Sequence, residues 1–178
     1  MKTPATCIAA ILLGLSAGPG WAQKAAPTDA QIAAIVATAN QVDIDAGKLA
    51  ESRSKSKDVR DFAQLMVTDQ TGVNKATDNL VTRLHVTPEL TPTSLTLQKS
   101  GDQNLATLKK LDGHAFDKAY VDHEVVYNES VLKALDKTLI PDAKSPELKA
   151  LLVKVRPAFE AHLERARKLQ ADLSGSGA

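Results

Sequence analysis

An apolar repeat near the carboxyl end most constrains what this chain can fold into. The repeat advances alternately by four and three residues, and a histidine is its single polar member. Its positions are Leu148, Leu152, Val155, Phe159, His162, Ala166, Leu169 and Leu173. This spacing places every member on one face of an α-helix, which turns once per 3.6 residues. Such a face must be buried against other elements, so the sequence predicts packed helices.

Three earlier segments show the same spacing, and no segment alternates as a strand would. The first predicted helix starts at Thr28 or Asp29, the second follows Ser56 and ends near residue 84, and the third covers residues 115–139. The last starts after Ser145, with proline at its first position. The fold class is therefore all-α.

The connection between the second and third long helices is expected to be long. Residues 85–94 contain two prolines, which remove hydrogen-bond donors and restrict the residues before them. A shorter helix is predicted over residues 94–111, stopped by Asp112 and Gly113. The length of the whole connection suits a helix-containing crossover that runs along a four-helix bundle.

The first segment, residues 1–22, has the order of a secretory signal peptide. Lys2 precedes an apolar run from Ile8 to Leu15, and the small residue Ala22 ends the segment. The run is far shorter than the ~20 apolar residues of a membrane-spanning helix. We therefore expect cleavage near Ala22 and a periplasmic or secreted chain that has no transmembrane helix.

Cleavage would remove the only cysteine and the only tryptophan, so the mature chain must be held by its core. Without Lys2, the mature chain has 21 basic and 21 acidic side chains, so its formal net charge is zero. This balance argues against nucleic acid as a partner. The expected organisation is one helical domain over residues 29–173, followed by a disordered tail at residues 174–178.

Polar side chains interrupt the apolar faces of all four long helices. They are Asp43, Asp69, Gln70, Glu124, Asn128 and His162, with Asp69 on the buried face of the second helix and Gln70 at the edge of that face. If they lie at similar heights they meet inside the bundle, where metal and cofactor sites are commonly built. The alternative is a hydrogen-bonded polar layer that binds nothing, since buried carboxyl groups need partners or a cation.

Motif spacing weakens the metal interpretation. Di-iron bundles use Glu-x-x-His on two helices. Here Phe159 lies three residues before His162, and Tyr127 lies three residues after Glu124. We therefore expect no cofactor, with one divalent transition-metal ion at a degenerate site as the alternative.

Enzymatic motifs are missing from the predicted mature sequence. It has no Gly-rich phosphate loop, no Gly-x-Ser-x-Gly elbow and no cysteine nucleophile. His85, His114 and His123 have no partner ligand at a metal-binding spacing and are interpreted as structural or surface residues. The sequence thus favours a protein that is not an enzyme.

Three stretches together resemble an exported bacterial family, domain of unknown function 4142. They are VDIDAGKLAESRSKSKDVRDFAQLMVTDQT, LDGHAFDKAYVDHEV and PAFEAHLERA. The resemblance covers about residues 29 to 173 and implies a ferritin-like four-helix bundle in the cell envelope, often labelled a membrane or outer-membrane protein. The family pattern has histidine at the positions of Gln70, Asn128 and His162, and this chain keeps only the last of the three. Amides are poor transition-metal ligands, so this chain departs from a possible ligand set.

The expected function is binding or interaction in the cell envelope, with an envelope protein or a small ligand as partner. A stress-related role rests on family analogy alone. The alternative is a metal-binding or redox bundle centred on Asp43, Asp69, Glu124 and His162. The sequence predicts neither an oligomeric state nor the identity of a partner.

Overall fold

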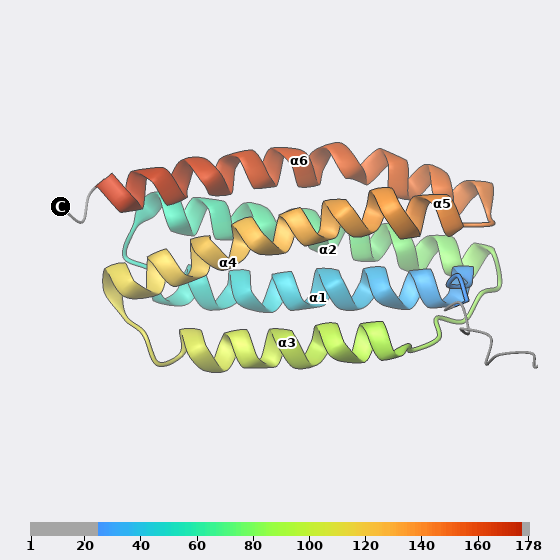
Figure 1. Ribbon diagram of the computed structural model, residues 1–178, viewed down its shortest axis with the longest axis horizontal. Coiled ribbons are helices and arrows are strands. Elements are labelled where there is room, and N and C mark those ends of the chain that lie inside the picture. Colours follow the sequence, from blue (N-terminus) through green and yellow to red (C-terminus); the bar gives the residue numbers. More distant parts are fainter. Residues whose placement is uncertain (1–24, 176–178) are drawn as a thin grey trace, which may run out of the picture.

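The computed structural model describes residues 25–175, and this part of the chain is all-α, with no strand. The long helices are α1 (Asp29–Arg53), α2 (Lys57–Arg83), α3 (Pro92–Leu108), α4 (Gly113–Ala134) and α6 (Pro146–Gly175). A π-helical turn, η1 (Leu135–Leu139), and a three-residue helix, α5 (Ile140–Asp142), connect α4 to α6. The long helices lie side by side along one axis (Figure 1). The predicted signal peptide lies outside the described residues.

Hydroxyl side chains cap the helices at the predicted starting points. The Thr28 hydroxyl accepts a hydrogen bond from the backbone N–H of Gln31, and the Gln31 side chain accepts one from the backbone N–H of Thr28. Ser56 caps α2 and Ser145 caps α6, each accepting from a backbone N–H three residues later. These bonds satisfy donors that have no partner within the helix, so the predicted starts of the first, second and last helices are confirmed.

Two predicted boundaries are wrong. The crossover helix α3 begins at Pro92 and ends at Leu108, whereas residues 94–111 were expected. Proline is favoured at a first helical position because the N–H it lacks would be unpaired there, and Thr91 supplies the cap. At the other end, α6 extends to Gly175, so the first two residues of the expected disordered tail are helical.

The end of the third long helix also differs from the regular helix predicted to residue 139. Residues 135–139 wind as a π-helix, in which the N–H of Ile140 donates to the carbonyl of Leu135. Pro141 follows directly. Its ring would clash with the carbonyl of Lys137 in a regular α-helix, which favours the wider winding. The π-turn places Leu135 and Leu139 in the interior.

Helix α3 packs along α1 and has little contact with α4 (Figure 1). A Cβ atom at Gly101 would lie 2.7 Å from a Val42 methyl carbon, so only glycine allows this approach of α3 to α1. Elsewhere α1 pairs with α2, and α4 pairs with α6. The arrangement leaves room between α3 and α4.

The buried apolar side chains form two clusters. One gathers around Phe62, Phe116 and Tyr120, and the other around Ile32, Leu135 and Leu152. On α1, α2 and α6 the two clusters occupy different stretches of helix, and buried polar residues lie between them. These intervening residues include Asp43, Gln70 and His162, which the sequence predicted, together with Asn40 and Thr77. The polar positions predicted from the sequence therefore separate two apolar cores.

Candidate functional site

Four fully buried polar side chains from α1, α2 and α4 form a connected polar layer. Gln70 Nε2 donates to Asp43 Oδ2 over 2.8 Å. The carboxyl groups of Asp43 and Glu124 are hydrogen-bonding partners of each other. Asn128 Nδ2 donates to the Glu124 carbonyl (2.9 Å) and reaches Glu124 Oε2 (3.4 Å). None of these residues is more than 1% exposed, so the predicted inward-facing positions of Asp43, Glu124 and Asn128 are correct.

Burial controls the charge of this layer. It raises the pKa of Glu124 from 4.5 to about 8, although hydrogen bonds to Asp43 and Asn128 act in the opposite direction. Burial also raises the pKa of Asp43 well above its ordinary value, and the neighbouring charge of Glu124 raises it further. Two neighbouring carboxyl groups in an apolar interior cannot both ionise, so the pair keeps at least one proton at neutral pH.

His162 and Asp69 form a separate pair beside the polar layer. His162 Nε2 lies 2.8 Å from Asp69 Oδ2, and the Asp69 side chain is 37% exposed. The sequence placed Asp69 on the buried face and Gln70 at its edge; the structure reverses them. Met66 is followed on the buried face by Gln70, one full turn later, because a 3.6-residue helix drifts against a 3.5-residue repeat.

The predicted metal ligands do not converge. Within residues 25–175, no group of three or more His, Cys, Asp or Glu side chains could hold a metal ion. Asp69 turns to His162, while Asp43 and Glu124 face each other and two neutral amides. This donor set does not fit the di-iron site of ferritin-like bundles or a transition-metal site built on three such ligands.

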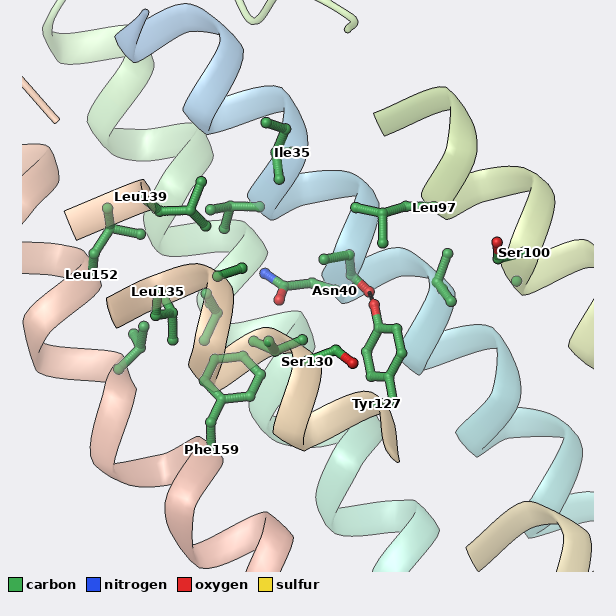
Figure 2. Close-up of a pocket in the computed structure, with 18 of the residues that line it drawn as sticks. Ile35, Asn40, Leu97, Ser100, Tyr127, Ser130, Leu135, Leu139, Leu152 and Phe159 are labelled. Carbon is green, nitrogen blue, oxygen red and sulfur yellow. Dashed lines mark hydrogen bonds between the residues drawn. The ribbon is translucent and has the colours of Figure 1, made fainter. Parts of the chain in front are cut away.

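An apolar pocket of about 400 Å³ lies beside the polar layer, between α1, α2, α3, α4, η1 and α6 (Figure 2). Most of its lining is aliphatic, and Phe159 adds an apolar aromatic ring. Its polar residues are Asn40, Ser100, His123, Tyr127 and Ser130. No Lys, Arg, Asp or Glu lines it. Its size and lining are typical of small-molecule sites.

Two stacked rings connect the pocket to the polar layer. His123 and Tyr127 both line the pocket, with ring centroids 5.5 Å apart and planes 19° from parallel. Tyr127 donates its hydroxyl to the carbonyl of Ala39 over 2.7 Å. His123 Nδ1 lies 3.8 Å from Glu124 Oε1. Burial lowers the pKa of His123, so this ring is neutral at physiological pH.

Asn40 supplies a hydrogen-bonding group inside the pocket. Its side chain is 3% exposed, and its Nδ2 donates to Asn74 Oδ1 over 2.9 Å. Figure 2 shows its carboxamide among the apolar side chains of the lining. Sequence reasoning missed Asn40, Tyr127 and His123 as site residues. Asn40 follows Val36 by four residues and precedes Asp43 by three, so helical spacing alone could have placed it near the buried face.

The fold and site define an all-α protein with a buried acidic layer and a neighbouring apolar pocket. The sequence model of domain of unknown function 4142 (DUF4142) matches residues 15–169. This chain belongs to that family, which confirms the resemblance. No curated protein matches it.

One similar solved structure comes from Streptomyces coelicolor and carries the description "putative secreted protein DUF305". The two structures superpose with a TM-score of 0.70 over 82% of this chain and 93% of the other. Their sequences are 14% identical, so the similarity concerns the fold. Among the described residues, no helix is long and apolar enough to cross a membrane.

Proposed function

We propose that this protein is an exported, ferritin-like four-helix bundle that binds a small apolar molecule in the cell envelope. Two observations support export: the signal-peptide pattern of residues 1–22 and the similarity in fold to a DUF305 protein described as putatively secreted. We propose that the chain is cleaved near Ala22 and is then periplasmic or secreted. The stress-related role and the envelope protein partner stay predictions from the sequence. Binding does not require either of them.

The observation that carries this proposal is the pocket of about 400 Å³. It is lined by the four long helices α1, α2, α4 and α6, and by α3, which has little contact with α4. Val126, which is 63% exposed, stands among its lining residues and offers apolar surface to an entering molecule. Burying apolar ligand surface there would contribute about 25 cal/mol per Å².

The alternative of one divalent transition-metal ion is less well supported. Only two carboxyl groups meet in the polar layer, and they keep at least one proton. A transition metal would have to displace that proton and accept amide oxygens as further ligands, which such ions bind weakly. The pocket needs no such rearrangement.

Filling the pocket tests the proposal. Ala134 lines it and is half-buried, so Ala134→Phe should occupy the cavity. The probe is N-phenyl-1-naphthylamine, an uncharged dye that fluoresces in apolar surroundings. We expect the variant to weaken dye binding by tenfold or more, about 1.4 kcal/mol.

Ala161→Phe is the matched control, because Ala161 is exposed on α6 and does not line the pocket. It should bind the dye as the unmodified protein does. Melting curves of both variants without dye show whether each is folded. Equal dye binding by folded Ala134→Phe protein would refute the proposal.

A further inference from the structure

We propose that the pocket selects uncharged amphiphiles whose head group donates a hydrogen bond, such as a hydrophobic alcohol or amide, and rejects anionic amphiphiles. This inference rests on the proposed function and names the ligand class. It concerns the chemistry of the lining rather than its volume.

Rejection of anions follows from the missing counter-charge. No lysine or arginine lines the pocket, so a carboxylate or sulfonate inside it would lose its hydration without gaining an ion pair. An unpaired buried charge is strongly unfavourable. An anionic ligand could therefore bind only with its head group left in solvent.

The neighbouring acidic layer adds to this effect. Glu124 lies directly behind the neutral His123 ring, with 3.8 Å between Nδ1 and Oε1. Asp43 is the hydrogen-bonding partner of Glu124 on its other side. Negative charge on this pair would repel an anion in the pocket at short range, where the low dielectric screens little.

Preference for a donor follows from the hydrogen bonds already made by the polar lining. The hydroxyl of Tyr127 donates to Ala39, and that of Ser130 donates to Val126. The amide nitrogen of Asn40 is held by Asn74, while its carboxamide oxygen makes no hydrogen bond within the described chain. That buried oxygen can accept a hydrogen bond from a ligand. The other lining groups without a hydrogen bond in the described chain are the His123 ring and the hydroxyl of Ser100, which is exposed.

A matched pair of dyes tests the rejection of anions. N-phenyl-1-naphthylamine is uncharged and carries one N–H donor, whereas 1-anilinonaphthalene-8-sulfonate is the same molecule with a sulfonate. We expect the uncharged dye to bind at least tenfold more tightly. A sulfonate that binds equally well, and that Ala134→Phe displaces, would overturn the inference while leaving the pocket intact.

A new positive charge should relax the selection. Ser130 is exposed and lines the pocket, so Ser130→Lys should raise the affinity for the sulfonate several-fold relative to the affinity for the uncharged dye. Thr68→Lys is the control, because Thr68 is exposed on α2 and bonds a carbonyl one turn earlier as Ser130 does, but lies away from the pocket. Equal responses of both variants would contradict the inference.

The donor preference has its own test. 1-Benzylnaphthalene replaces the N–H of the uncharged dye by a methylene, and its affinity can be measured by displacement of the dye. It should bind about fivefold more weakly, as expected for one net hydrogen bond. In Asn40→Leu protein the two affinities should converge. Equal affinities in the unmodified protein would refute the role of Asn40. If neither molecule binds in an Ala134→Phe-sensitive way, the proposed function itself fails.

Discussion

Glu124 carries a carboxyl group in an interior without solvent contact, and its burial should have a measurable effect on stability. It is fully buried, and its partners are Asp43 and Asn128. Its raised pKa means that folding takes up a proton instead of releasing one. A buried carboxyl pair of this kind makes stability depend on pH.

The sign of that dependence follows from the proton count. Burial raises the pKa of Glu124 from 4.5 to about 8, so between these values the folded protein holds a proton that the unfolded chain has lost. The free energy of unfolding should therefore fall as pH rises through this window, by on the order of 1.4 kcal/mol per pH unit at the steepest. Below pH 4.5 this loss of unfolding free energy is absent, and above pH 8 it is complete.

Urea denaturation at several pH values measures this slope. Glu124→Gln keeps the shape of the side chain and cannot ionise, so it should reduce the slope, and Asp43, whose pKa burial also raises, should account for the remainder. Glu164→Gln, at an exposed position on α6, should not. An unchanged slope in Glu124→Gln protein would show that another group is responsible.

The amides at positions 70 and 128 give a second prediction at the residue scale. Gln70 contacts Asp43, and Asn128 contacts Glu124. Imidazoles at both positions would place two nitrogen ligands beside two carboxylates, a donor set that suits Zn²⁺ or Fe²⁺. The double variant Gln70→His with Asn128→His should raise the melting temperature in added zinc, whereas the unmodified protein should not respond.

Among the helices, α3 determines whether the pocket exists. It approaches α1 closely at Gly101 and leaves α4 partly uncovered. The π-turn η1 contributes Leu135 and Leu139 to the same pocket. Two irregular features, a close glycine contact and a widened turn, thus shape one cavity.

The glycine contact can be tested by adding one methyl group. A Cβ at Gly101 would lie 2.7 and 2.8 Å from the two methyl carbons of Val42, so Gly101→Ala should push α3 from α1 and cost about 1–3 kcal/mol of unfolding free energy. At Gly72 no atom lies within 4 Å of the added Cβ, so Gly72→Ala should stabilise α2 by roughly 0.5–1 kcal/mol. If Gly101→Ala and Gly72→Ala lowered the free energy of unfolding equally, the close packing of α3 against α1 would be contradicted.

At the scale of the whole molecule, helical periodicity predicted the all-α class and the cap residues Thr28, Ser56 and Ser145, because these depend on local sequence. It also placed Asp43, Glu124 and Asn128 inside. It exchanged Asp69 and Gln70, since one residue of helical phase decides which of two neighbours is buried. It could not predict the pocket, because the six elements that form its walls are positioned only by tertiary packing.

The central claim is that the pocket beside the acidic layer holds a small uncharged molecule. Native mass spectrometry of protein purified from the producing cell's envelope tests it most directly. We predict an adduct of defined small mass that organic extraction recovers as a neutral amphiphile, present in Ala161→Phe protein and absent from Ala134→Phe protein. An adduct that is anionic, or one that persists when the pocket is filled, would contradict the account.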